Sequence, residues 1–210
     1  PTEHSSAFIR YIGSPMATQP KRPSSKFVKK SKATVLKSRV TYRAPVFYVT
    51  SEMVREPSGV TARRDIVRHP GSVVVLAVEG SGRNARVLLA RQFRHAANRE
   101  MLELPAGRID PGETPLQGAK RELIEETGYR ARKWSKAMFF YVSPGFLDET
   151  MTIFLAEELQ AGKATPEEDE VIRPRFVSLA KAVDMVMRGR IQDAKTVAGV
   201  LWYGKIAARS

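Results

Sequence analysis

Hydrophobic residues from about position 35 onward follow the two-residue period and the short apolar runs that are typical of β-strands. The run 73–78 is continuously apolar, which indicates a strand covered on both faces. Strands are predicted over 46–50, 61–68, 72–78, 86–93, 101–104, 136–142, 150–157 and 171–179, and helices over 115–127, 179–188 and 193–208. These elements mingle without regular β-α-β alternation, so the pattern predicts an α/β/α layered fold with a mixed sheet.

The same pattern divides the chain into three expected parts. Residues 1–34 mix Pro, Ser, Thr and Lys with little periodicity, which is typical of an irregular basic arm. Residues 35–70 hold short strands but are too few to bury a core of their own. Residues 71–210 would then form the main domain. The arm can be a solvated tail, a fusion remnant or a nucleic-acid arm, and these alternatives stay open.

The charge of the chain is concentrated near its start. The whole protein has a formal net charge of +13. Residues 1–70 hold 14 Lys and Arg against 4 Asp and Glu, whereas residues 71–210 hold 21 against 18. Clustered cations of this kind attract a phosphate backbone, which makes nucleic-acid binding an alternative function for the chain. The main domain is nearly neutral, so the total charge does not describe it.

Composition also excludes several kinds of chemistry. The 210 residues include no cysteine, which rules out disulfides, thiol nucleophiles and cysteine-ligated zinc. The longest apolar run is far shorter than the roughly 20 residues of a membrane-spanning helix, and we recognise no secretion signal. We therefore expect a cytoplasmic protein whose chemistry uses oxygen and nitrogen groups.

The segment 107–129 has well-marked helix boundaries and a cluster of acids. Thr114 and Gln117 fit a capping box, Pro115 fits the first helical position, and Gly128 fits a left-handed stop. Three glutamates then stand at i, i+3 and i+4, on one face of the helix. They are Glu122, Glu125 and Glu126.

Three carboxylates on one helix face repel one another unless a cation lies among them. Hard divalent ions, Mg²⁺ or Mn²⁺ foremost, prefer such oxygen ligands. Arg121 can neutralise only part of the charge. A solvated acidic face paired with lysines is the alternative interpretation of any Glu-rich helix.

The spacing of the segment favours the metal. Gly107, Glu113, the run 121–123, the pair 125–126 and the pair 128–129 match the Nudix box at every position where that box specifies a residue. The chain resembles the Nudix hydrolase family over roughly residues 40–205. The resemblance implies the Nudix fold, an α/β/α sandwich with a mixed sheet, preceded here by a small β-rich segment. It also implies metal ligands, which would be Glu122, Glu126, Glu125 and the carbonyl of Ala106.

Segments outside the box resemble the ADP-ribose pyrophosphatase branch of that family. These are 91–94, 102–110 and 143–146, and Pro144 lies 16 residues after Gly128, a spacing associated with that branch. The branch cleaves ADP-ribose to AMP and ribose 5-phosphate. Relatives that act on other nucleoside diphosphate sugars share parts of these segments, so a pyrophosphatase for another such sugar is the first alternative.

The resemblance also suggests residues that contact the substrate. A guanidinium grips phosphate oxygens with two charge-assisted bonds, so Arg94 is the main candidate for the diphosphate. Arg64 and Arg68 fall where relatives bring residues to the adenosine. The remaining candidates are Gly107, Arg108 and Ser143.

The attacking water needs a general base, which relatives place on a loop beyond the 143–146 segment. Here that loop is 161–170, with Glu168 or Glu170 as candidates and Glu149 or Glu125 in reserve. Glu113 is expected to support the box loop. Relatives in this branch are commonly homodimers joined through their amino-terminal strands, so we expect a homodimer.

Overall fold

The computed structural model describes residues 32–164 and 172–208. Its strands are β1 (Thr34–Arg43), β2 (Tyr48–Arg55), β3 (Thr61–Arg68), β4 (Ser72–Glu79), β5 (Arg86–Arg94), β6 (Arg99–Glu103), β7 (Ala106–Arg108), β8 (Arg130–Tyr141), β9 (Thr150–Gln160) and β10 (Arg173–Ser178). Its α-helices are α1 (Pro115–Thr127), α2 (Leu179–Met187) and α3 (Ala194–Ala207), and short 3-10 turns cover Gly82–Asn84 and His95–Ala97.

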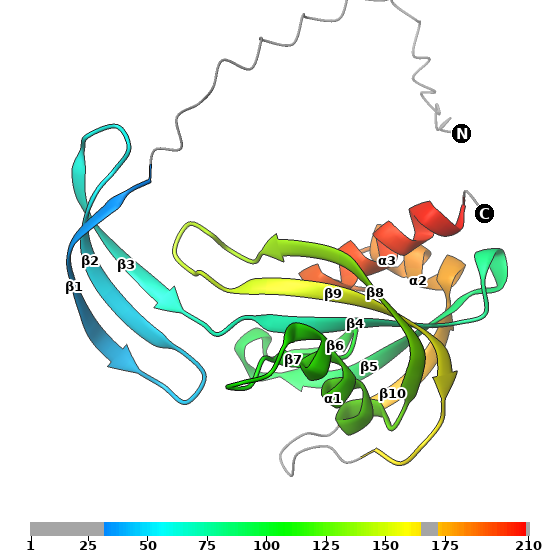
Figure 1. Cartoon of the computed structure of the whole chain (residues 1–210). Helices are drawn as coiled ribbons and strands as arrows, with labels where there is room; N and C mark the ends of the chain where they lie inside the picture. The colour runs from blue at the N-terminus through cyan, green and yellow to red at the C-terminus, as the bar shows by residue number, and fades with distance from the viewer. Residues whose placement is uncertain (1–31, 165–171, 209–210) are drawn as a thin grey trace, which may run out of the picture.

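The first three strands form a sheet of their own, which stands to one side of the rest of the molecule (Figure 1). Strand β2 pairs antiparallel with both β1 and β3. Every residue of β1 is exposed, whereas alternate residues of β2 are buried. Among the described residues of this small sheet, only alternate positions of β2 are buried.

The larger sheet has seven strands and is mixed, as predicted. Along its main path the order is β10-β5-β4-β9-β8. Strands β4 and β9 run parallel, and the other pairs in this sheet are antiparallel. All residues of β4 except the last are buried, which confirms that this apolar run is covered on both faces.

A split in the large sheet makes room for the acidic segment. Strands β4 and β5 pair only through Val78–Val87 and Glu79–Arg86 and then diverge. Beyond the split, β6 pairs with β5 and β7 pairs with β4. The chain between β6 and β7 therefore crosses from one side of the gap to the other, and the box loop follows directly.

Helices cover both faces of this sheet, which gives the predicted sandwich (Figure 1). Because side chains alternate along a strand, β4 supplies both cores. Val73 and Val75 pack with Leu123 of α1. Leu76 packs on the opposite face, in the core to which Val200 of α3 belongs. The α/β/α fold class is thus confirmed.

The structure also differs from the sequence prediction in three strands. Strand β1 has no predicted counterpart, because its alternating basic and apolar residues are all exposed and carry no burial signal. Strand β8 begins at Arg130 rather than at 136, since its first half is mostly polar. The three-residue strand β7 is set by pairing with β4 and not by its own composition.

Several predictions fall outside the described residues. They concern most of the arm 1–34 and the candidate bases Glu168 and Glu170. The boundaries at 34 and 70 stay predictions as domain boundaries. Within the two described ranges, no helix is both long and apolar enough to cross a membrane.

Candidate active site

Helix α1 starts and stops where the sequence predicts. The Thr114 hydroxyl accepts a hydrogen bond from the Gln117 N–H, and the Gln117 side chain accepts one from the Thr114 N–H at 2.8 Å. Gly128 closes the helix with φ 75°, a left-handed conformation that favours glycine. The capping box and the stop fix where the helix begins and ends, and Glu122 and Glu126 lie on its buried side.

The loop before the helix is held by the residue predicted to support it. The Glu113 carboxylate accepts a hydrogen bond from the Asp110 N–H at 3.2 Å and two from the Arg121 guanidinium. These bonds keep the pKa of Glu113 below its usual value, the hydrogen bond from Arg121 being the largest cause. Glu113 thus works within the loop, as expected.

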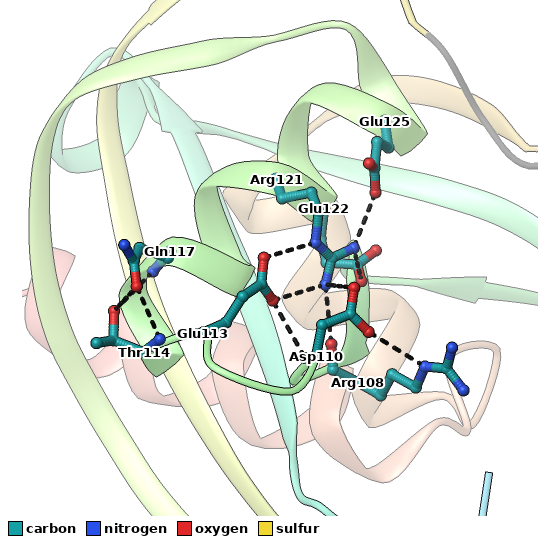
Figure 2. Close-up of polar contacts among 8 residues, drawn as sticks. All are labelled: Arg108, Asp110, Glu113, Thr114, Gln117, Arg121, Glu122 and Glu125. Atoms are coloured by element: carbon teal, nitrogen blue, oxygen red, sulfur yellow. Dashed lines mark hydrogen bonds and ion pairs between the residues drawn. The ribbon is translucent and has the colours of Figure 1, made fainter.

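Arg121 is the hub of the box (Figure 2). Its Nη1 donates to Glu122 at 2.7 Å and to Glu125 at 2.9 Å, and its Nη2 donates to the Arg108 carbonyl at 3.0 Å. Hydrogen bonds from this guanidinium, first of all to Glu113, raise the pKa of Arg121 further above its already high value. One cation thus lies among several carboxylates, which leaves the cluster negatively charged.

Gly107 leaves space for the Glu122 carboxylate against β7. A Cβ at this position would lie 1.9 Å from Oε1 of Glu122. Real atoms cannot approach so closely, so only glycine lets this carboxylate reach β7. The box glycine and the box glutamate therefore form one packing unit.

The carbonyls of β7 alternate in direction. The Pro105 carbonyl and the Ile109 N–H bond to the chain of β4, at Val75 and Gly71. By the alternation of an antiparallel ladder, the Ala106 carbonyl points away from β4, on the side where the Arg108 carbonyl accepts from Arg121. The Ala106 oxygen is therefore directed toward the acidic cluster.

These groups surround a hollow of about 310 Å³. Six of the predicted site residues line it, together with Asp110, Arg121 and Val46 from the β1–β2 turn. The six are Arg94, Ala106, Gly107, Arg108, Glu122 and Glu125. A larger cavity of about 480 Å³ lies between α2 and α3, but Arg83 is the only charged residue that lines it. We place the candidate site at the smaller hollow, because the carboxylates and arginines that could bind a metal or a phosphate line it.

Arg94 reaches the hollow from β5 as one member of a buried ion network. Its Nε and Nη2 donate to the two oxygens of Glu103, at 3.0 and 2.8 Å. The hydrogen bond to Glu103 raises the pKa of Arg94, and the charges of Glu126 and Asp193 act in the same direction. Lys195 of α3 makes a close contact with the same Glu103 carboxylate.

Glu126 is buried beside this network. It is 5% exposed, and its charge acts on Arg94. In the described part of the chain, no three acidic or imidazole side chains stand together as a complete metal site. Figure 2 shows the Arg121 guanidinium bonded to both Glu122 and Glu125.

Two predicted substrate contacts lie away from the hollow, in the small sheet. Arg68 donates to Glu52 at 2.8 Å and to Asp148 at 3.0 Å, and thereby ties β3 to the segment after the 143–146 run. Arg64 forms an ion pair with Glu56 at 2.8 Å. Neither arginine is among the residues that line the hollow.

Ser143 and Glu149 lie in the connection from β8 to β9. The Ser143 carbonyl accepts from the Leu147 N–H at 3.0 Å, which closes a turn. The Glu149 carboxylate accepts from the Ser72 hydroxyl at 2.6 Å, and Ser72 pairs with Arg108 across β4 and β7. Glu149 is thus one strand away from the box loop.

Sequence reasoning missed three residues that shape the site. Glu103 and Lys195 belong to the Arg94 network, and Val46 lines the hollow. A signal existed for one of them, because Lys195 sits in the first turn of a helix, where the dipole disfavours a cation. Glu103 belongs to the segment 102–110 that carries the family resemblance but was not singled out in it, and nothing local distinguished Val46.

Comparison with known proteins agrees with this geometry. The NUDIX domain family model matches residues 68–199. An ADP-ribose pyrophosphatase of Bacillus subtilis (strain 168) is 41% identical over 78% of this chain and 87% of its own length. A methanol dehydrogenase activator of Bacillus methanolicus is 34% identical over 79% and 89%. A crystal structure of an ADP compounds hydrolase has a TM-score of 0.70 at 23% identity, covering 83% of this chain and 94% of that one, and so shares the fold.

A family model that spans most of the chain, a complete Nudix box on its helix and a relative with 41% identity leave one assignment. The chain belongs to the Nudix family, and it is a hydrolase of that family.

Proposed function

We propose that this enzyme hydrolyses the pyrophosphate bond of ADP-ribose, with a divalent metal, to AMP and ribose 5-phosphate. The observation that carries the proposal is the hollow in which Arg94 faces an acidic cluster. The oxygens of a diphosphate bind cations, and its cleavage develops further negative charge. Arg94 and a metal held by the acidic cluster would supply those cations. The 41% identical ADP-ribose pyrophosphatase supports the choice of substrate.

The donor set of the cluster fits a hard divalent cation. Glu122, Glu126 and Glu125, with the carbonyl of Ala106, would hold it, and all four supply oxygen. The glycine that lets Glu122 reach β7 is part of this fit, since any side chain there would displace the carboxylate. A metal bound here would supply Lewis-acid stabilisation of the diphosphate oxygens. Mg²⁺ or Mn²⁺ are the proposed ions.

The arginines would divide the remaining work. Arg94, fixed by Glu103 through two hydrogen bonds, would orient the diphosphate. Arg121 would keep Glu125 and Glu122 in place through the bonds from its Nη1. Gly107 and Arg108 would bring the backbone of β7 to the substrate, as the lining of the hollow suggests.

The general base stays a prediction. Glu168 and Glu170 are proposed from the family resemblance and lie outside the described residues. Glu149 already accepts a hydrogen bond from Ser72, and Glu125 accepts one from Arg121. The proposed adenosine contacts of Arg64 and Arg68 and the substrate contact of Ser143 rest on the same resemblance.

The test is turnover measured across ADP-ribose, ADP-glucose, GDP-mannose, NADH and a dinucleoside polyphosphate, with magnesium, with manganese and with chelator. We expect metal-dependent release of AMP from ADP-ribose to exceed all other rates. A higher rate on another nucleoside diphosphate sugar would keep the reaction and reject the substrate. Silence on every compound would reject the function and favour the nucleic-acid alternative.

Glu126→Gln tests the site assignment in the same assay. Loss of a carboxylate that helps to hold the metal should lower kcat by about a hundredfold or more, because metal stabilisation of the developing charge is worth several kcal/mol. The matched control is Glu79→Gln, which removes an exposed carboxylate paired with Arg86 far from the hollow. Full metal-dependent activity of Glu126→Gln would reject the assigned ligands.

We also propose that the enzyme is a homodimer. Strand β1 is exposed along its whole length, with Val35 and Val40 more than 40% exposed. A sheet of three strands needs cover on one apolar face to be stable, and a second copy would supply it. The turn that ends β1 carries Val46 to the hollow, so an assembly through this sheet would also act on the site.

A further inference from the structure

A chain of alternating charges runs from the hollow into the body of the protein. Arg94 bonds to Glu103, Glu103 contacts Lys195, and Lys195 contacts Asp193 at 3.0 Å. The first residue comes from β5, the second from β6 and the last two from the start of α3. The network thus joins three elements behind the acidic box.

The hydrogen bonds between Arg94 and Glu103 fix the plane of the Arg94 guanidinium. Two parallel N–H···O bonds, from Nε and from Nη2, hold the guanidinium edge against the carboxylate. A guanidinium is rigid and planar, so fixing this edge also fixes the direction of Nη1. Arg94 lines the hollow, while the side chain of Glu103 is only 4% exposed. The buried carboxylate therefore decides how the arginine is presented.

Lys195 is the unusual member of the network. Its side chain is 7% exposed, and burial of an ammonium group costs several kcal/mol before its contacts repay it. It also lies in the first turn of α3, where the helix dipole disfavours a cation. Replacing a whole buried ion network by apolar residues is often neutral for stability, but removing one charge from it leaves the opposite charge underpaired. Lys195 compensates the buried Glu103 carboxylate together with Arg94, which points to a role in the site.

That role follows from the two cations on Glu103. Burial opposes ionisation of this carboxyl group, but the hydrogen bond from Arg94 and the charge of Lys195 outweigh it and hold the pKa of Glu103 below its usual value. A substrate anion that binds Nη1 of Arg94 shares the positive charge of the guanidinium with Glu103. Because Lys195 stays on the carboxylate, Glu103 keeps a second cationic partner when Arg94 engages that anion.

One further bond ties α3 to the residue after β6, and another caps the helix. The Thr196 hydroxyl accepts from the Leu104 N–H at 2.8 Å, and the Asp193 carboxylate accepts from the Thr196 N–H at 3.0 Å. Asp193 thus caps α3 and pairs with Lys195 at the same time. The Lys195 ammonium group therefore lies between the carboxylates of Glu103 and Asp193, and it stays on Glu103 when Arg94 binds an anion.

We infer that Glu103 and Lys195 are positioning residues that set the orientation of Arg94 toward the diphosphate of the substrate. This inference rests on the proposed function, because it takes the diphosphate as the ligand of Arg94. Neither residue touches the substrate, so both act through the arginine.

A double-mutant cycle tests the inference. Lys195→Met, Arg94→Ala and the double variant are compared in kcat and KM for ADP-ribose and in the affinity for ADP and for adenosine, measured by calorimetry. In the wild-type background we expect Lys195→Met to weaken the binding of ADP and to raise KM for ADP-ribose, each by roughly tenfold. The reason is that the Arg94 guanidinium would no longer be held in its binding orientation. In the Arg94→Ala background it should add less than about twofold, because the residue it acts through is absent. Affinity for adenosine should stay unchanged.

Matched variants separate positioning from folding. Lys195→Arg keeps the charge and should restore most of the ADP affinity. Lys205→Met removes an exposed lysine from the same helix and should change nothing. Glu103→Gln serves as a second route if Lys195→Met does not fold, and it should show the same dependence on Arg94. Thermal unfolding of each variant reports the structural cost separately.

The outcomes distinguish the two proposals. Equal effects of Lys195→Met with and without Arg94, on an enzyme that cleaves ADP-ribose, would overturn the positioning role alone. A protein that binds ADP with the expected coupling but cleaves no member of the substrate panel would retain the positioning role and reject the proposed function. A protein that neither cleaves these substrates nor binds ADP would overturn both.

Discussion

Strands β1 and β4 have similar lengths and opposite environments. Seven of the eight residues of β4 are buried, whereas all ten residues of β1 are exposed. Strand β4 has helices on both faces, and strand β1 lies at the edge of a three-stranded sheet (Figure 1). Among the described residues, the large sheet is therefore covered on both faces, whereas the outer strand of the small sheet is exposed.

The same contrast divides the functional groups. The box, Arg94 and its ion network all belong to the large sheet and its helices. The small sheet contributes Val46 to the hollow and uses Arg68 to bond with Asp148. The candidate site thus lies mainly on the large sheet, whose strands and helices surround the core. This arrangement fits the need of a catalytic site for rigid support.

The largest effect expected on stability comes from Leu76→Ala in β4. Leu76 is 0% exposed, so the change should lower the free energy of unfolding by about 2–5 kcal/mol. Val40→Ala in β1, which is 42% exposed, should cost less than about 0.5 kcal/mol in a monomer. Urea unfolding of both variants at low protein concentration measures the difference. Similar costs at the two positions would show that β1 is covered after all.

A smaller effect, with a pH signature, is expected from Glu103→Gln. Because the folded pKa of Glu103 lies below its ordinary value of 4.5, ionised Glu103 stabilises the folded state fully above that pH. This contribution is lost as the pH falls through the folded pKa. At about pH 7 the free energy of unfolding of the wild type should therefore exceed that of Glu103→Gln by roughly 1–3 kcal/mol. The gap should narrow progressively below pH 4.5.

Glu52 provides the matching measurement in the small sheet. Its pKa is also lowered, mainly by the hydrogen bond from Arg68, but it lies in a sheet only three strands wide. The difference in the free energy of unfolding between wild type and Glu52→Gln should fall over the same pH range but be smaller throughout, because Glu103 has a second, buried cation on its carboxylate, Lys195. A gap that is independent of pH for both variants would contradict the ion-pair account.

A small effect on the folded chain is also expected from Val40→Glu. The variant should keep the stability of the isolated monomer to within about 1 kcal/mol, because the residue is exposed there. It should nevertheless shift the particle from dimer to monomer, since a buried charge disfavours an interface. Light scattering over a range of protein concentrations measures this. Lys37→Glu, on the opposite face of β1, is the control, and a wild type that is monomeric throughout would reject the homodimer.

The sequence by itself determined the fold class and the metal-box candidates. Val73–Val78 had to be covered on both faces because no polar residue interrupts it, and β4 is central as a result. The capping box, Pro115 and Gly128 fixed α1 to the residue. Such signals are local, because they depend on backbone groups and on side chains one helical turn apart.

Tertiary structure alone decided how the site is held together. Glu103 and Lys195 are 92 residues apart in the chain, and their contact depends on the packing of α3 against β6. The clash that requires glycine at 107 exists only because α1 lies against β7. The exposure of β1 likewise depends on tertiary packing, because none of the described elements covers its side chains. Periodicity reports which face of an element is buried, but the partner that buries it is chosen by the whole fold.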